Sequence, residues 1–223
     1  MRRDAMTSTE PRLYPVALRL TGRSCLVVGG GAVAARKVRS LVESGAAVTV
    51  VSPELGADLA ATHAQDVRWA WQPREFRAED ADGCLLVVAA TDDPTVNRAV
   101  AFAASQAGAL SNVADDPEAS DFFVPSVIQR GQLQLTVGTG GSAPAVAAAV
   151  KRRLEAVFPV EWGEVVAILG RAREEASARG LDEEARRELA LQLAGLDIDM
   201  ILTEGGIPSF AEAVTACISR FSA

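Results

Sequence analysis

The chain has 223 residues, of which 49% are hydrophobic, 29 are acidic and 22 are basic. Its length suffices for one good-sized domain with an appendage, or for two small domains. The formal net charge of -7 argues against a nucleic-acid partner, because such partners require a clustered excess of Lys and Arg. A polyanionic small substrate needs only a local basic patch, so the global charge leaves that class open.

Cysteine and histidine usage indicates a reducing compartment and no metal cofactor. Cys25, Cys84 and Cys217 lie far apart in apolar surroundings and form no CxxC pair. The single histidine, His63, argues against a structural zinc site, and we expect it to be a solvent-facing helix residue. The N-terminus turns polar after two arginines, and no apolar stretch is long enough to span a bilayer. We therefore expect a cytoplasmic protein without a membrane partner.

The first half of the chain alternates apolar runs with helix-length segments. A glycine-led helix over Ala32–Ser44 follows the first run, and a helix ending near Ala107 follows the fourth. Such alternation predicts an α/β fold with a Rossmann-type, doubly wound parallel sheet over residues 1–117. The five expected strands are Ser24–Val28, Ala46–Val51, Val67–Trp71, Cys84–Ala90 and Leu110–Val113.

Beyond Pro117 the pattern changes, and we divide the remainder into residues 118–158 and 159–223. The first of these parts contains a predicted hairpin and then a helix, and the second is helical throughout. Ser142 is the candidate cap of the helix in the first part. The predicted elements are strands over Phe122–Ile128 and Leu133–Val137, a helix over Pro144–Val157, a break at Gly205–Pro208 and a last helix over Ser209–Phe221.

Three consecutive glycines, Gly29, Gly30 and Gly31, stand between the first strand and its helix. Glycine lets the backbone bend sharply and approach a ligand closely, and the helix start attracts a pyrophosphate. With Ala34 at the third position, the spacing matches the GxGxxG/A pattern in its required strand-to-helix context. The segment predicts a dinucleotide site, and the alternative is a glycine turn that only packs the helix on the strand.

The end of the second strand bears on the choice between NAD and NADP. The ribose-binding acid usual at this point is missing, because Val51 is followed by Ser52, Pro53 and Glu54. Ser52 can hydrogen-bond a ribose hydroxyl, and Glu54 would repel a 2′-phosphate, so the residues favour NAD. Alternatively, Glu54 only caps the next helix.

Polar residues also follow the fourth and fifth strands, where parallel sheets bring ligand-binding loops together. Thr91, Asp92 and Asp93 follow the fourth strand, and Asp115 and Asp116 follow the fifth. One carboxylate here could act as a general base beside a nicotinamide. Helix capping or turn formation accounts for Asp92, Asp93 and Asp116. The residues alone do not select Asp115 over Asp116.

Five motifs over Leu13–Phe158 together resemble the precorrin-2 dehydrogenase family, which also forms the N-terminal half of siroheme synthases. They are VVGGGAVAARKV, VTVVSPE, VVAATDDPTVN, SNVADDP and FVPSVIQRGQLQLTVGTGGSAPAVA. The resemblance implies that NAD accepts a hydride from precorrin-2 to give sirohydrochlorin, and in many members that ferrous iron is then inserted to give siroheme. It also implies a homodimer, with residues 118–158 as the dimerisation and substrate segment.

The resemblance assigns the site residue by residue. The family's NVxD motif places its catalytic aspartate on Asp115, and its regulatory serine, found in some relatives, is Thr139 here. The cofactor set is Gly29, Gly30, Gly31, Ala32, Val33, Ser52, Pro53, Glu54, Thr91, Asn112 and Val113. The substrate set is Arg130, Thr139, Gly140, Gly141 and Ser142.

A polycarboxylate substrate calls for cations, and the candidates besides Arg130 are Arg36, Lys37 and the run Lys151–Arg153. Alternatively, that run is only a favourable charge set near a helix C-terminus. A competing function is a non-catalytic NAD(H)-sensing module. Such a module has no need of Asp115 or of the TGGSAP loop.

Overall fold

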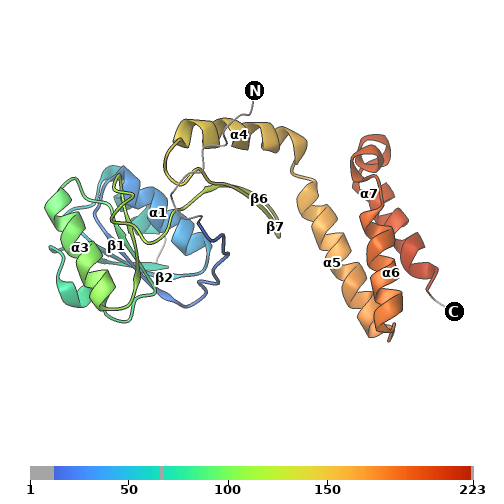
Figure 1. Ribbon diagram of the computed structural model, residues 1–223, viewed down its shortest axis with the longest axis horizontal. Helices are drawn as coiled ribbons and strands as arrows, with labels where there is room; N and C mark the ends of the chain where they lie inside the picture. The colour runs from blue at the N-terminus through green and yellow to red at the C-terminus, as the bar shows by residue number, and fades with distance from the viewer. Residues whose placement is uncertain (1–12, 66–67, 222–223) are drawn as a thin grey trace, which may run out of the picture. The chain divides into compact units, whose positions relative to one another are not determined.

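The computed structural model describes residues 13–65 and 68–221, which form two compact units (Figure 1). The first unit extends to Val124 and the second starts at Pro125, whereas the sequence divides the chain at residues 117 and 158. Residues 118–124 belong to the first unit because they fold back along its last strand, where the Asp121 N–H donates to Ser111 O at 2.8 Å. The predicted polar N-terminal stretch and Val67 lie outside the described residues.

The first unit contains a five-stranded parallel sheet in the order β3-β2-β1-β4-β5, which confirms the predicted fold class. The order reverses beside β1, and ligands of such sheets bind at the carboxyl ends of the strands next to this point. Each strand lies within its predicted segment or one residue beyond it. The strands are β1 (Ser24–Val28), β2 (Ala47–Val51), β3 (Trp69–Gln72), β4 (Leu86–Ala89) and β5 (Leu110–Val113).

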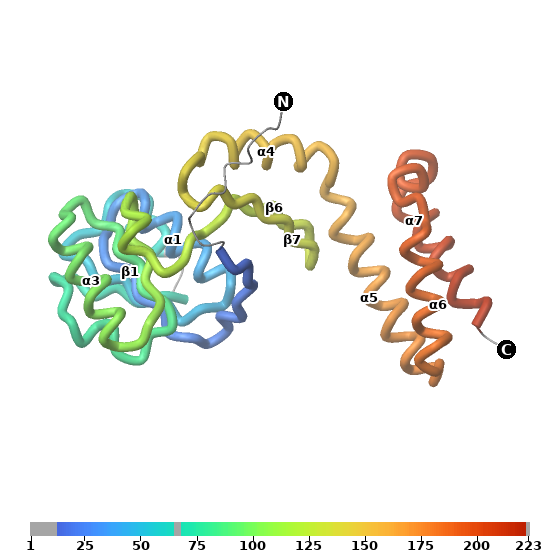
Figure 2. The backbone as a smooth tube through the Cα atoms, in the orientation of Figure 1, coloured from blue at the N-terminus to red at the C-terminus, as the bar shows by residue number. Residues whose placement is uncertain are grey.

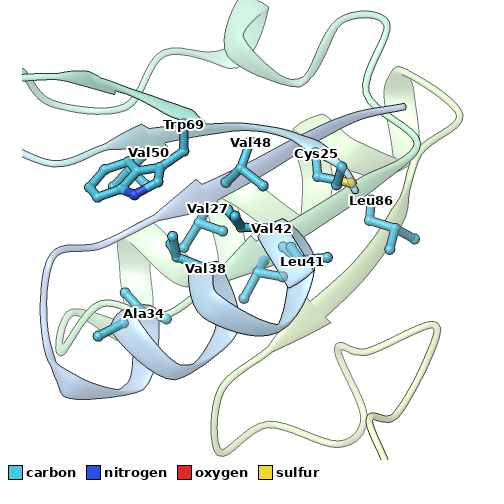
Figure 3. Packing of buried hydrophobic residues seen from close by; sticks show 14 of the residues in the cluster. Cys25, Val27, Ala34, Val38, Leu41, Val42, Val48, Val50, Trp69 and Leu86 are labelled. Atoms are coloured by element: carbon cyan, nitrogen blue, oxygen red, sulfur yellow. The ribbon is translucent and has the colours of Figure 1, made fainter. Parts of the chain in front are cut away.

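Helices cover both faces of this sheet, which explains why β1 and β4 are apolar without alternation. Cys25 and Val27 face α1 and α2, and Leu26 and Val28 face α3 and η1. Figure 3 shows the α1 side, where Val38 packs among the valines of β1 and β2. The helical elements are α1 (Ala32–Glu43), α2 (Ala57–Gln65), η1 (Ala78–Ala81) and α3 (Pro94–Gln106).

The second unit contains an antiparallel hairpin and four helices (Figure 2). Helix α4 packs on the hairpin, and α5, α6 and α7 share a core around Phe210. The hairpin starts at Ser126, four residues after its predicted start at Phe122. Gly206, with φ 65°, breaks α7 within the predicted break. The elements are β6 (Ser126–Arg130), β7 (Leu133–Val137), α4 (Pro144–Val157), α5 (Trp162–Ala178), α6 (Glu183–Ala194) and α7 (Ile198–Ser219).

His63 is half-buried, which corrects its prediction as a solvent-facing residue. Its ring centroid lies 4.4 Å from that of Trp69 and 6.1 Å from that of Trp71. Within residues 13–65 and 68–221, no three His, Cys, Asp or Glu side chains come together as metal ligands would. None of the helices in these ranges has the length and apolarity needed to cross a bilayer.

Candidate functional site

Two of the three consecutive glycines let the loops after β1, β2 and β4 pack together. Gly29 has φ 122°, and a Cβ at this position would lie 2.3 Å from the carbonyl oxygen of Ala90. A Cβ on Gly30 would lie 2.0 Å from the carbonyl oxygen of Glu54. Real Cβ atoms do not approach backbone atoms this closely, so neither position accepts a side chain without movement of the backbone.

Gly31 serves a different purpose, because a Cβ there would meet nothing within 4 Å. This residue is the N-cap of α1 and offers no side chain to the first N–H groups of the helix. Those donors and the positive end of the helix dipole are left for a ligand, as a pyrophosphate requires. The loop of Gly29, Gly30 and Gly31 together with the start of α1, called the glycine cradle below, therefore fits the phosphate part of a dinucleotide.

The start of α2 meets the start of α1 at this cradle. The Gly56 N–H donates to Gly30 O at 2.9 Å, and a hollow beside them is lined by Gly30, Gly31, Ala32, Gly56, Ala57, Asp58 and Leu59. The last four residues were not predicted as part of the site. A glycine just before a helical stretch is the signal that could have indicated them. The first helical hydrogen bond of α2, from Ala60 N–H, goes to Gly56 O, so Gly56 rather than Glu54 holds the cap position.

Ser52 supports the loop after β2 from inside. Its side chain is buried, and its hydroxyl donates to Glu54 O at 2.7 Å. The indole Nε1 of Trp71 donates to Ser52 O at 3.0 Å. The structure therefore gives the Ser52 hydroxyl proton a partner within the protein, and the contact of Ser52 with a ribose hydroxyl stays a prediction. Pro53 and Glu54 are exposed beside it.

The loop after β4 is held by Asn97 and capped by Asp93. Asn97 is buried, accepts from the Thr91 hydroxyl at 2.7 Å and donates to Thr91 O at 3.0 Å. The Asp93 carboxylate accepts from the Thr95 N–H at 2.7 Å, which confirms Asp93 as a helix cap. That backbone hydrogen bond lowers the pKa of Asp93.

Asp115 occupies an unusual backbone conformation after β5. Among the described residues it is the one non-glycine with positive φ, at 62°. A residue with a Cβ is disfavoured in this region, and such positions concentrate at functional sites. Its side chain is exposed, whereas the Asp116 carboxylate accepts from the Ala119 N–H at 3.2 Å and forms a turn as predicted.

Hydrogen bonds hold the chain on both sides of Asp115. Before it, the Ala114 N–H donates to Ala89 O at 2.8 Å, and after it, the Asp116 N–H donates to Val113 O at 3.3 Å. The returning segment also covers the free edge of β5, where the Asp121 carboxylate accepts from the N–H and the hydroxyl of Ser111, each at 2.8 Å. The conformation of Asp115 is thus imposed by its surroundings.

Asn112 and Val113, predicted as cofactor contacts, have inward-facing roles. The Asn112 Nδ2 donates to Phe122 O at 2.9 Å, and its Oδ1 accepts from the Lys37 ammonium at 2.7 Å. Val113 is buried in the core on the α3 side, and its N–H donates to the Ser120 hydroxyl. Lys37, predicted as a substrate cation, is half-buried. Burial lowers the pKa of Lys37, and the charge of Arg36 lowers it further.

The first unit matches a known family model, and most of the chain matches curated proteins. Residues 16–126 fit the model described as putative NAD(P)-binding. The siroheme synthase of Thioalkalivibrio sulfidiphilus is 44% identical over 174 residues, which are 78% of this chain and 35% of that protein. Siroheme synthase 3 of Aeromonas hydrophila is 42% identical over 183 residues, 82% of this chain and 39% of that protein. The chain is a homologue of the siroheme synthases. It spans little more than a third of these relatives' length.

The solved structure of SirC, a precorrin-2 dehydrogenase, superposes on this siroheme synthase homologue with a TM-score of 0.78. The superposition covers 94% of this chain and 100% of SirC, with 25% sequence identity. The superposition therefore includes residues of both compact units. The resemblance inferred from the sequence motifs is confirmed.

The predicted substrate residues lie in the second unit of the homologue. The Ser142 hydroxyl donates to Thr139 O at 2.6 Å, and Gly140 and Gly141 both have positive φ, so the segment is a tight turn before α4. The prediction of Ser142 as helix cap is wrong, because the N-cap is Ala143 and has no side-chain capping bond.

Two of the predicted cations of the second unit, Arg130 and Lys151, have partners within that unit. The Arg130 Nε donates to Phe158 O at 2.9 Å, and its Nη1 donates to Gln129 O at 3.2 Å. The Lys151 ammonium lies 3.7 Å from the Glu155 carboxylate, one helical turn along α4. The guanidinium of Arg130 therefore supports the hairpin, and the pair on α4 is the kind expected on an exposed helix face.

Proposed function

We propose that this chain is an NAD-dependent dehydrogenase that oxidises precorrin-2 to sirohydrochlorin. The observation that carries the proposal is the exposed Asp115 carboxylate, held in a strained turn at the sheet edge where the glycine cradle opens. The likeness to SirC and to the siroheme synthases supports the substrate class. A dinucleotide and one positioned carboxylate are the minimum equipment for this oxidation.

The cradle residues fit NAD and divide the work of holding it. The N–H groups at the start of α1, from Ala32 onwards, bind the pyrophosphate, and Gly31 leaves the space for it. Exposed Glu54 and Asp58, on either side of Gly56, disfavour a second phosphate on the ribose by charge repulsion. When bound, NAD supplies the hydride acceptor.

Asp115 acts as the general base of the reaction. Oxidation of precorrin-2 removes two electrons and two hydrogens, one as a hydride and one as a proton. The Asp115 carboxylate takes the proton, so the products are sirohydrochlorin, the reduced cofactor and a proton that passes on to water. The hydrogen bonds of Ala114 and Asp116 keep the carboxylate at the sheet edge during this step.

The sensing alternative explains the cradle but gives no role to the Asp115 turn. A strained non-glycine residue costs about 1–3 kcal/mol and persists only where its surroundings impose it. A sensor that needs no base would be more stable with glycine at this position. Catalysis accounts for both features.

Anaerobic mixing of the protein with precorrin-2 and NAD tests the proposal. We expect the precorrin-2 absorbance to be replaced by that of sirohydrochlorin, with one equivalent of NADH formed. An Asp115→Asn variant serves as the control for contaminating activity. Unchanged precorrin-2 absorbance with properly folded, NAD-binding protein would refute the function and favour the sensor.

Ferrous iron insertion into sirohydrochlorin is a second step that we propose for the same chain. The macrocycle supplies four nitrogen ligands and loses two N–H protons, so the protein has to supply a proton acceptor rather than a metal cage. Exposed Asp115 is the group that can accept them. Siroheme formation from sirohydrochlorin and ferrous iron, compared with and without the protein, tests this step independently of NAD.

We also propose a homodimer in which α4 takes part. Val146, Val150 and Val157 lie on one face of this helix and are 57%, 37% and 56% exposed, with Leu154 between them. An apolar stripe of this kind is unusual on a free surface and suits an isologous contact. Light scattering checks the mass: Val150→Glu should give monomers, and Val160→Glu, outside α4, should not.

The second unit is the proposed source of substrate contacts, with the Thr139–Ser142 turn as the first candidate. Its two glycines have positive φ, and backbone N–H groups in turns of this kind can bind substrate carboxylates. A cytoplasmic location completes the proposal, supported by the three free thiols Cys25, Cys84 and Cys217.

A further inference from the structure

Lys37 connects the nucleotide helix to the strand that leads to Asp115. It lies in the second turn of α1, between Ala34 and Val38, which are buried against the sheet. Its ammonium donates to Asn112 Oδ1 at 2.7 Å, across 75 residues of sequence. No other hydrogen bond between side chains joins α1 to β5 among the residues that the structure describes.

The ammonium of Lys37 has a neutral partner where a charged one would be expected. In the described part of the chain no carboxylate forms an ion pair with it, and the charge that contributes to lowering its pKa is that of Arg36, of the same sign. A half-buried lysine without a carboxylate is unfavourable, because desolvation is not offset by an opposite charge. Packing alone would be better served by an apolar side chain such as methionine. The charge at this position therefore needs a functional explanation.

The charged ammonium of Lys37 orients the side-chain amide of Asn112. Its Oδ1 accepts from Lys37 and its Nδ2 donates to Phe122 O, so the amide is held in one orientation between α1 and the segment that returns after Asp115. Asn112 is buried and lies in register with Val88 of β4. Three residues later the chain reaches the positive φ of Asp115. A charge-assisted hydrogen bond is stronger and more directional than one between neutral groups.

We propose that Lys37 is a positioning residue for the dehydrogenation: through Asn112 it ties the Asp115 turn to the helix that holds the dinucleotide. The inference rests on the proposed function for its kinetic consequence, but the linkage itself is a property of the folded chain. The hydrogen bond between Lys37 and Asn112 would then hold the base and the cofactor site at a fixed distance from each other, although it contacts neither of them.

Hydrogen exchange of the intact protein tests the linkage without any substrate. In Lys37→Met, amides of residues 110–122 should exchange about tenfold faster than in the wild-type protein, while those of β1 and β2 keep their protection. Lys37→Arg should restore most of the protection. The matched control is Arg39→Met, which removes an exposed positive charge from the same helix and should leave residues 110–122 unchanged. Equal exchange rates of the amides of residues 110–122 in Lys37→Met and Arg39→Met would overturn the proposal.

Steady-state kinetics separate positioning from binding. We expect Lys37→Met to lower kcat about 10- to 100-fold, with KM for precorrin-2 and the calorimetric Kd for NAD within about threefold of wild type. A rise in KM with unchanged kcat would show that Lys37 contacts the substrate instead, and would overturn the proposal. So would a loss of NAD affinity as large as the loss of kcat.

A double-mutant cycle with Asn112→Leu identifies the route. If Lys37 acts through Asn112, the double variant should be no slower than the slower single variant, whereas additive losses would exclude this route. Should the wild-type protein fail to oxidise precorrin-2, the proposed function falls, and the exchange measurements still decide whether Lys37 orders the Asp115 turn.

Discussion

The two turns at the carboxyl edge of the sheet are built in opposite ways. The glycine turn at Gly29–Gly31 depends on the absence of side chains, since Cβ atoms at two of its positions would collide with neighbouring carbonyl groups. The turn at Asp115 keeps a side chain in a conformation that suits glycine, and many hydrogen bonds around it impose that conformation. One turn makes room for a ligand, and the other presents a group to it.

This difference separates the two kinds of requirement at a redox site. A dinucleotide that is held during hydride transfer needs space and backbone donors, which glycine provides at little strain. A base needs a carboxylate at a defined point, and strain is accepted in exchange for that placement. The two turns should therefore respond differently to substitution, in fold stability as well as in activity.

Asp115→Asn should have the largest effect on activity and almost none on folding. Asparagine tolerates the left-handed conformation as aspartate does but cannot take a proton, so kcat should fall about 10²–10⁴-fold. NAD affinity and melting temperature should stay at wild-type values, as measured by calorimetry. A comparable loss of NAD affinity would mean that the two turns do not have separate roles.

Gly30→Ala should destabilise the fold at the glycine cradle, whereas Gly31→Ala should only weaken NAD binding there. A Cβ added at residue 30 would lie 2.0 Å from a backbone oxygen, so we expect more than about 3 kcal/mol of lost stability in urea unfolding. At residue 31, φ is -81°, and an added Cβ would have no heavy atom within 4 Å. Alanine there should therefore change the free energy of unfolding by less than about 1 kcal/mol. NAD binding should nevertheless weaken in Gly31→Ala. Unchanged NAD affinity there would place the pyrophosphate elsewhere.

How well the two turns could be predicted follows from the same contrast. The glycine turn is local, because its strand, its three glycines and its helix are consecutive, and the sequence was sufficient to locate it. The turn at Asp115 depends on contacts with Ala89, Ser120 and Lys37, which no sequence period relates to residue 115. Residue types alone left Asp115 and Asp116 equivalent, and the family motif was needed to choose between them.

Side-chain roles within correctly predicted loops were the least predictable. Ser142 was expected to cap α4 but donates to Thr139 O, and the bond from the Ser52 hydroxyl to Glu54 O was not predicted. A serine hydroxyl bonds a nearby carbonyl group as readily as it bonds a ligand or a helix end. Only the local backbone path decides between these partners. The strands of the parallel sheet, in contrast, follow from apolar runs and were placed to within about two residues.

Asp115→Gly should raise stability while abolishing activity. Glycine removes the Cβ penalty at φ 62°, and part of this gain is lost to the greater entropy of the unfolded chain. We expect a net stabilisation of about 0.5–1 kcal/mol in urea unfolding. Asp115→Ala is the matched control, because it removes the carboxylate but keeps the Cβ, and it should gain nothing. Equal stability of the two variants would show that the turn is not strained.

The smallest effect concerns the pH dependence that Lys37 adds to the Asp115 turn. The folded pKa of Lys37 is lowered by burial below its ordinary value of 10.5. Between these two values the unfolded chain binds more protons at this site than the folded chain, so the contribution of Lys37 to stability rises with pH. Lys37→Met lacks this contribution, and the free energy of unfolding of the wild-type protein should gain on that of the variant as the pH approaches 10.5.

Urea unfolding of both proteins from about pH 7 to about pH 10 measures this difference, in which titrations shared by the two proteins cancel. Each unit of pKa separation corresponds to about 1.4 kcal/mol, and the half-buried ammonium should give only a fraction of it. A difference that stays constant over this range would mean that the ammonium remains fully hydrated in the folded protein, and the turn at Asp115 would then be held without a buried charge.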